Sequence, residues 1–189
     1  EIEAFMESHP REVVLLDFQD ESAEGALRDA LATHPLSGRA WVQVAGTPWP
    51  TLQEMIEADQ RMVIFGGGHP EDPPWMLPKT QHIVSSGWSY WEPEDLDCET
   101  SGPVPEFGLY EVTHVLTNPL ASPYNAEEIN TEELLVAHLA QCDEEVAFVN
   151  LLSVDFYTIG EPLSVIGARN ASAGPVAVSP RADGLRPRP

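Results

Sequence analysis

Short apolar runs separated by helical patterns constrain the fold of this chain more than any other feature. Val13–Phe18, Arg61–Phe65 and Phe148–Phe156 are such runs, and the last is the strongest strand signal in the chain. Strands that are buried on both faces of a parallel sheet have this near-continuous apolar character. Helical patterns or loops lie between the runs, and this alternation predicts an α/β fold with a parallel sheet.

The remaining elements follow from periodicity and from capping residues. Thr51–Glu54 is a capping box that predicts a helix start, and Thr131 is expected to cap another helix. The segment 66–79 contains four prolines and is expected to be irregular. Helices are expected at Ile2–Ser8, Ala23–His34, Thr131–Cys142 and Pro162–Arg169, and extended segments at Gly38–Val44, Ile83–Trp91 and Leu109–Leu116.

The chain opens with a helix that has no strand before it, so upstream strands of a βα repeat are expected to be missing. A complete (β/α)8 barrel needs about 250 residues, whereas this chain has 189. A doubly wound sheet is the alternative, but no G-x-G-x-x-G turn is present. We therefore expect one domain over residues 1–170 and a disordered tail rich in Pro, Ala and Arg over 171–189.

Charge excludes some partners. The chain has 31 acidic residues against 9 Lys and Arg, a net charge of -22. A surface this acidic repels phosphate backbones, so no nucleic-acid partner is expected. No apolar run approaches the roughly 18 residues of a membrane span, so no transmembrane segment is expected.

In a βα barrel the reactive groups lie at the C-terminal ends of strands, and this rule selects the candidate site. Asp155 is the most distinctive candidate, because it is an acid at the end of the most apolar strand and needs a partner if it is buried. Its alternative role is to cap the following turn through the amides of Thr158 or Ile159. The candidates for substrate contact are Asp17, Gln19, Trp88, Tyr90, His114 and Tyr157.

Metal and cysteine chemistry give weaker signals. His69, Glu71 and Asp72 lie in a proline-rich run without a fixed ligand spacing, so we expect no metal site there. The two cysteines, Cys98 and Cys142, match no zinc or redox spacing. They are either buried free thiols or a disulfide.

Four segments together resemble one known family, the phosphatidylinositol-specific phospholipase C-like phosphodiesterases of the X-domain type. The resemblance covers about residues 1–168 and is closest to the secreted bacterial and fungal branch, which implies an extracellular location. The segments are Ile2–Gln19 (IEAFMESHPREVVLLDFQ), Trp49–Phe65 (WPTLQEMIEADQRMVIF), Leu109–Leu116 (LYEVTHVL) and Asn150–Gly160 (NLLSVDFYTIG).

This resemblance implies a distorted (β/α)8 TIM barrel that cleaves a phosphodiester with two histidines, one acting as base and one as acid. The opening helix matches the third helix of the family, so the chain would cover strands 4–8. The strands that carry both histidines would be missing, and this fragment by itself is expected to be inactive. Asp155 then matches the acid that orients the base, with Tyr157 beside it, and Asp17 or Gln19 matches a pocket position on strand four.

The family also bears on cofactors, substrate and the cysteines. No cofactor is expected in this fragment, although Ca²⁺ is possible in full-length relatives. The expected substrate is a phospholipid head group or a related small phosphodiester. The alternatives are a glycerophosphodiester phosphodiesterase and a catalytically dead barrel that acts as a binding module. On the barrel, Cys98 and Cys142 would both approach the floor, where they could pair.

Overall fold

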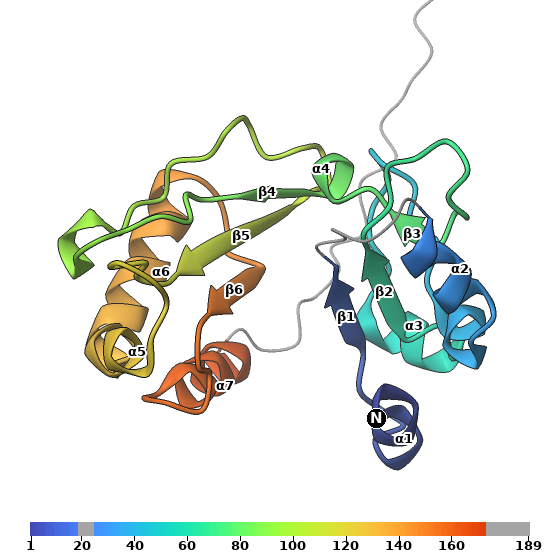
Figure 1. Cartoon of the computed structure of the whole chain (residues 1–189), viewed down its shortest axis with the longest axis horizontal. Coiled ribbons are helices and arrows are strands. Elements are labelled where there is room, and N and C mark those ends of the chain that lie inside the picture. Colours follow the sequence, from blue (N-terminus) through green and yellow to red (C-terminus); the bar gives the residue numbers. More distant parts are fainter. Residues whose placement is uncertain (19–24, 173–189) are drawn as a thin grey trace, which may run out of the picture.

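The computed structural model describes residues 1–18 and 25–172, which form two three-stranded parallel sheets. We call the part up to residue 78 the first lobe and residues 83–172 the second lobe (Figure 1). The first sheet has the order β1-β2-β3 and the second the order β4-β5-β6. The strands are β1 (Val14–Asp17), β2 (Met62–Phe65), β3 (Met76–Leu77), β4 (Ile83–Ser85), β5 (Leu109–His114) and β6 (Leu151–Val154).

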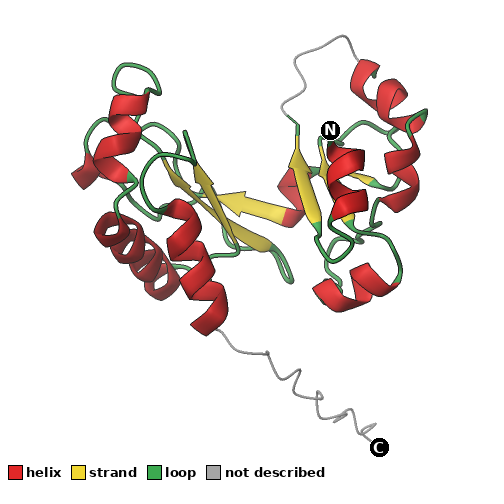
Figure 2. Cartoon of the chain, turned by 90° about the horizontal axis from the view of Figure 1, so that it is seen from below, coloured by secondary structure: helices red, strands yellow, loops and turns green. Residues whose placement is uncertain are grey.

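Helices lie on the outer flank of each sheet, and the strands of both lobes lie between them (Figure 2). The short helix α4 (Lys79–His82) joins the two lobes (Figure 1). The other helices are α1 (Ile2–Ser8), α2 (Ala26–Ala32), α3 (Leu52–Glu57), α5 (Pro123–Ile129), α6 (Glu132–Glu145) and α7 (Pro162–Ser172), with 3-10 turns at Pro35–Arg39 and Pro93–Asp95.

The strand β2 shows why a continuous apolar run becomes a central strand. All four of its residues are buried, because the two faces of the first sheet pack against different groups of side chains. Met62 and Ile64 pack in a cluster with Met6 of α1, whereas Val63 and Phe65 face the opposite way. A strand covered on both faces has no position for a polar side chain.

A separate apolar cluster connects the lobes. It contains Val63 and Phe65 of β2, Ile83 of β4, and the partly buried Leu109 and Leu151 of β5 and β6. The second lobe has its own core, in which β5 packs against α6 and α7. The two sheets therefore share part of their apolar interior.

Most predicted elements are present, and both predicted caps are confirmed. Thr51 and Glu54 form the reciprocal capping box of α3. The hydroxyl of Thr131 accepts a hydrogen bond from the amide of Leu134 at the start of α6. Each cap satisfies amides that a helix N-terminus leaves without partners.

Several expectations need correction. The segment 66–79 is not wholly irregular, because Met76 and Leu77 pair with Ile64 and Phe65 as β3. Pro74 and Pro78 lie close on either side of this strand and lack amide protons for a ladder, which accounts for its length of two residues.

Two further segments differ from the expectation. The segment 83–91 is a strand only as far as Ser85, and within 38–44 only Ala40 forms a bridge, to Met62. The helix α5 was not predicted, although Ser122 followed by Pro123 is a recognisable start signal. The tail predicted from residue 171 begins later, since Ala171 and Ser172 belong to α7, and its remainder lies outside the described residues.

Among the described residues, β1 pairs only with β2, and β6 pairs only with β5. Each of these strands therefore has one edge without a neighbouring strand in this part of the chain. None of the helices in the described ranges combines the length and apolar character that a membrane span needs.

Candidate functional site

A cavity of about 890 Å³ opens at the C-terminal ends of the three strands of the first sheet. Asp17 ends β1, Gly66–Gly68 follow β2, and Lys79 comes two residues after β3. The carboxyl ends of parallel strands meet at one edge of a sheet, which is where open α/β folds bind ligands. The cavity is also lined by Phe18, Gly25, Arg28, His69, Asp72, Met76, Pro78 and Thr80.

Glycine is required where the loop after β2 passes β3. A Cβ atom at Gly67 would lie 2.0 Å from the backbone oxygen of Met76, a distance that no side chain tolerates. This close approach lets the amides of Gly66 and Gly67 both donate to the carbonyl of Leu77. The glycine run, interpreted from sequence as a turn, therefore fixes the wall of the cavity.

A charged cluster lies beside the cavity and joins the two lobes. The ammonium group of Lys79 contacts the carboxylate of Asp17 and lies 3.0 Å from Oε2 of Glu111 on β5. Glu111 is 9% exposed and also accepts hydrogen bonds of 2.5 Å from the hydroxyls of Ser85 and Ser153. The cluster therefore joins side chains from four strands: Asp17 of β1, Ser85 of β4, Glu111 of β5 and Ser153 of β6.

Electrostatics keeps this cluster ionised. Burial tends to raise the pKa of Glu111, but hydrogen bonds from Ser153, Ser85 and Lys79 outweigh burial and lower it. Burial likewise tends to lower the pKa of Lys79, and its bonds to Asp17 and Glu111 raise it. Lys79 is therefore a fixed cation at the cavity wall, and its third N–H is not used by these two carboxylates.

The loop after β2 already binds one carboxylate. The amides of Gly68 and His69 donate to Oδ2 of Asp72, at 2.9 and 2.8 Å. Adjacent amides that point at one place are a common anion-binding arrangement. Here an acid of the chain itself occupies it, and Asp72 also lines the cavity.

Asp155 follows directly after β6 and is half-buried. Its backbone oxygen accepts a hydrogen bond from the side-chain amide of Asn130. Its carboxylate makes no hydrogen bond or ion pair with any described residue. The amide of Ile159 donates to the carbonyl of Phe156 at 2.7 Å, so this amide is not capped by Asp155.

Among the other predicted contact residues, His114 lines a small interior void together with Asp155, and the rest do not converge on one place. Trp88 and Tyr157 are exposed, and Gln19 lies outside the described residues. Tyr90 is buried and its hydroxyl donates to Oδ1 of Asp97, and burial raises its pKa to about 12. The cavity that Asp17 lines does not include Asp155.

His114 is wholly buried and both of its ring nitrogens face other protein atoms. Nδ1 lies 2.9 Å from Nδ1 of His138, and Nε2 lies 2.9 Å from the carbonyl oxygen of Ile129. Burial lowers the pKa of His114 to about 4, so the ring is neutral at pH 7. In the described structure it therefore has no nitrogen that faces a substrate.

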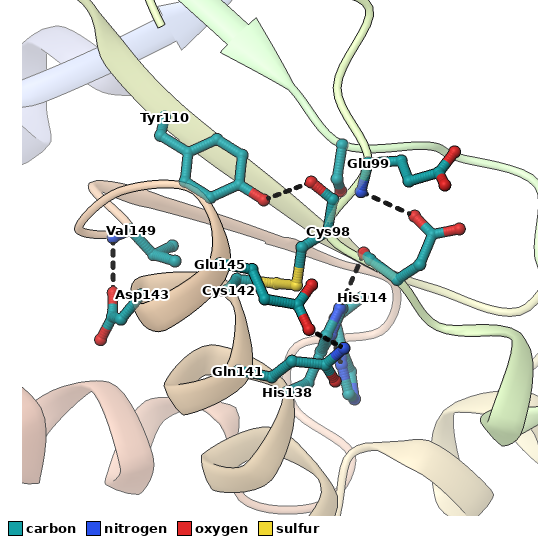
Figure 3. Close-up of a disulfide and its surroundings, with 12 residues drawn as sticks. Cys98, Glu99, Tyr110, His114, His138, Gln141, Cys142, Asp143, Glu145 and Val149 are labelled. Atoms are coloured by element: carbon teal, nitrogen blue, oxygen red, sulfur yellow. Dashed lines mark hydrogen bonds between the residues drawn. A yellow bond between two sulfur atoms is a disulfide. The ribbon is translucent and has the colours of Figure 1, made fainter. Parts of the chain in front are cut away.

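Cys98 and Cys142 are joined by a disulfide bond with an S–S distance of 2.04 Å (Figure 3). The bond ties the loop before β5 to α6, and both residues belong to the core of the second lobe. The sequence left open whether these cysteines are free thiols or a disulfide, and the structure contains the disulfide.

The sequence argument missed Lys79, Glu111, Ser85 and Ser153. Glu111 had a usable signal, since it is an acidic residue between Tyr110 and Val112 within a predicted strand. Lys79 had none, because its role depends on which strands α4 connects.

The fold and the cavity define a parallel α/β protein with a polar site at its strand ends. A family model described as PI-PLC X 1 matches residues 1–170, and the chain therefore belongs to the PI-PLC X family. Comparison with curated proteins and with solved structures gives no match. The resemblance inferred from the sequence is thus confirmed at the level of the family.

Proposed function

We propose that the chain forms the C-terminal part of a (β/α)8 barrel that cleaves a phosphodiester. Family membership supports this proposal, and the single structural observation that carries it is Asp155. This acid follows directly after β6, a strand with one edge unpaired among the described residues, and its carboxylate has no partner among them. A further strand paired with that edge would place its side chains next to Asp155.

The arrangement of the sheets supports a barrel. Two parallel sheets with outer helices share an apolar cluster, and Lys79 and Glu111 form an ion pair between them. A closed barrel leaves no strand edge, whereas β1, β3, β4 and β6 each have one among the described residues, so closure requires β3 and β4 to approach each other as well. Strands from an upstream segment would fill the space between the edges of β1 and β6. The strands β1, β2, β4, β5 and β6 would then correspond to strands four to eight, and the two-residue strand β3 would be an addition to the barrel pattern.

In the proposed reaction, two histidines of the upstream strands act on the phosphodiester as base and acid. Asp155 accepts a hydrogen bond from one ring nitrogen of the base and leaves the other nitrogen free to take a proton. It also stabilises the imidazolium that forms as the proton moves. The described residues alone supply no such pair, and we expect the isolated chain to be inactive.

The substrate we propose is a phospholipid head group or a related small phosphodiester, bound at the strand ends near Lys79. The third N–H of this lysine is available for a phosphate oxygen. Asp17 and Asp72 line the same cavity, so a head group that donates hydrogen bonds fits it better than a second anionic group. A glycerophosphodiester satisfies the same constraints and is the second candidate substrate.

Calcium, which the family resemblance allows in full-length relatives, does not fit the charged cluster at the cavity. The ammonium group of Lys79 contacts Asp17 and Glu111, and both oxygens of Glu111 accept bonds, so a dication here would meet a fixed cation and too few free oxygens. An extracellular location is part of the proposal, and the disulfide supports it because disulfides persist in oxidising compartments.

The test is Asp155→Asn in the protein extended by its upstream region, assayed on phosphatidylinositol and on glycerophosphodiesters. We expect turnover to fall by about 10²- to 10⁴-fold with an unchanged unfolding temperature, as for other His–Asp pairs. Asp59→Asn is the matched control, because Asp59 is an acid in ion pairs with Arg39 and Arg61 outside the cavity. Turnover close to that of the control would remove Asp155 from the mechanism.

The same assay separates the alternatives. A binding module would hold the head group without turnover in the extended protein, and Asp155→Asn would then change neither binding nor stability much. Preference for glycerophosphodiesters over phosphatidylinositol would select the second candidate substrate.

A further inference from the structure

Four buried side chains with metal-binding chemistry meet in the core of the second lobe (Figure 3). Two of them, His138 and Cys142, lie one turn apart on α6 and so share one face of this helix. Cys98 comes from the loop before β5, and His114 ends β5. Their exposed fractions are 2% for Cys98, 0% for His114, 5% for His138 and 0% for Cys142.

The two histidines present an unusual arrangement of protons. Nε2 of His114 lies 2.9 Å from the carbonyl of Ile129, and Nε2 of His138 lies 3.1 Å from the carbonyl of Asp97. A carbonyl oxygen only accepts, so each neutral ring carries its single proton on Nε2. The two Nδ1 atoms, 2.9 Å apart, then face each other with lone pairs. Two lone pairs that face each other repel, so this arrangement is favourable only with a cation beside the two Nδ1 atoms.

The sulfur atoms are close enough to take part. Both sulfurs and a ring nitrogen of His138 lie within 4.8 Å of one another. Two sulfurs and two imidazole nitrogens are the ligand set of closed, tetrahedral zinc sites. In such sites the second nitrogen of a ligating histidine donates to a carbonyl or a carboxylate, as both rings do here.

We propose that, when the disulfide is reduced, Cys98, Cys142, His138 and His114 bind one Zn²⁺ ion. A dithiol reductant supplies two electrons and two protons, so the disulfide becomes two thiols while the reductant becomes a disulfide. Zn²⁺ then displaces both thiol protons. One dication with two thiolates and two neutral imidazoles carries no net charge, which makes the complex compatible with a buried site.

The shifts that the cysteines and His138 must make are small, whereas His114 lies outside the group of ligand atoms within 4.8 Å of one another and must approach the sulfurs by rotation of its ring. With Zn–S bonds of about 2.3 Å, the two sulfurs of a tetrahedral site lie about 3.8 Å apart. The Cα atoms of Cys98 and Cys142 are 5.2 Å apart, which rotation about the side-chain bonds accommodates. The two Nδ1 atoms would separate to about 3.3 Å for Zn–N bonds near 2.05 Å.

The site has a physical use that is separate from the proposed reaction. The disulfide ties the loop before β5 to α6, and a zinc ion on the same residues would keep that tie in a reducing environment. The same cross-link would then exist in two chemical forms, chosen by the redox state and by the supply of metal.

The experiment uses the whole chain, prepared metal-free in an oxidised form and in a form reduced with a water-soluble phosphine under anaerobic conditions. Co²⁺ is the first probe, because tetrahedral thiolate coordination gives intense visible bands and thiolate-to-cobalt charge-transfer bands. We expect these bands, at one ion per chain, only for the reduced form, and we expect Zn²⁺ to abolish them. Circular dichroism with Zn²⁺ or Mg²⁺ reports whether metal restores any structure lost on reduction.

Variants decide the ligand set. His138→Asn should weaken Zn²⁺ binding by more than about 100-fold, beyond the effect of losing a supporting hydrogen bond. His114→Asn should also weaken it. His82→Asn is the matched control, because His82 is a buried histidine that packs against Trp49 and Phe65.

Three outcomes would overturn the proposal. One is a reduced chain, folded or unfolded, that neither binds Zn²⁺ stoichiometrically nor gains structure from it. Another is a His138→Asn variant that binds Zn²⁺ as tightly as His82→Asn does. The last is an oxidised chain that binds Zn²⁺ as tightly as the reduced one, which would place the metal elsewhere.

Discussion

The two lobes have the same kind of sheet but are stabilised in different ways. In the first lobe, apolar clusters cover both faces of β2, and a cavity lies at the strand ends. In the second lobe, β5 packs against two long helices, and a disulfide joins α6 to the loop before β5. The first lobe therefore has a cavity at its strand ends, whereas the second lobe has a covalent cross-link in its core.

This difference gives the two lobes different roles: the first lobe forms the cavity, and the second is held together by a disulfide. Loops that line a cavity need backbone conformations set by glycine and proline, and such loops contribute little apolar burial. The second lobe packs its central strand against two helices and has a covalent tie. The ion pair of Lys79 and Glu111 and the shared apolar cluster connect the two lobes, so both decide how independently the lobes unfold.

The largest effect is expected from removing the disulfide in a chelator-containing buffer. Cys98→Ser with Cys142→Ser opens a loop of 44 residues. The chain-entropy relation gives a loss of about 4 kcal/mol in the free energy of unfolding. Denaturant unfolding measures the loss, and hydrogen exchange should rise in β4–β6 more than in β1–β3. An equal rise in both lobes would contradict their independence.

Breaking the ion pair between the lobes should cost less. Glu111→Gln leaves Lys79 with Asp17 alone and weakens two serine hydrogen bonds. We expect a loss of about 2 kcal/mol, because the pair is buried on the side of Glu111 but Lys79 is 34% exposed. Exchange should rise in both lobes. Asp29→Asn, which removes an exposed carboxylate paired with Arg28, is the control that should change little.

The Glu111→Gln variant also tests how the free energy of unfolding depends on pH. Glu111 has a lowered pKa in the folded state, so its ionised form is stabilising above the unfolded value, near 4.5. That contribution is lost as the pH falls through the lowered folded value. The stability difference between wild type and Glu111→Gln should therefore be constant from pH 7 to about pH 5 and shrink below about pH 4.5. A difference that grows in acid would contradict the assigned sign.

The smallest effect concerns the first lobe alone. Thr51→Ala removes the capping box of α3 and should cost about 1 kcal/mol. Hydrogen exchange should rise in α3 and hardly change in the second lobe. Thr158→Ala serves as the comparison, because Thr158 is exposed and lies in a turn outside any helix cap, and equal losses in the two variants would show that the cap is not the cause.

The sequence predicted the elements with the clearest local signals and missed those that depend on partners. The helix α6 was predicted because Thr131 and its apolar periodicity are local features. The two-residue strand β3 was missed because Met76 and Leu77 become a strand only through pairing with β2. Of the residues that line the cavity, Asp17 was predicted from its position at a strand end, whereas Lys79 was not.

What the sequence alone determined is the class of the fold, the alternation of its elements and the family, because apolar runs and caps are written in consecutive residues. What only the tertiary structure decided is the division into two sheets, the disulfide, the buried histidine pair and the contact of Lys79 with Glu111. Each of these joins residues at least 24 positions apart. Contacts of that range are set by how the sheets and helices pack, and no local pattern encodes them.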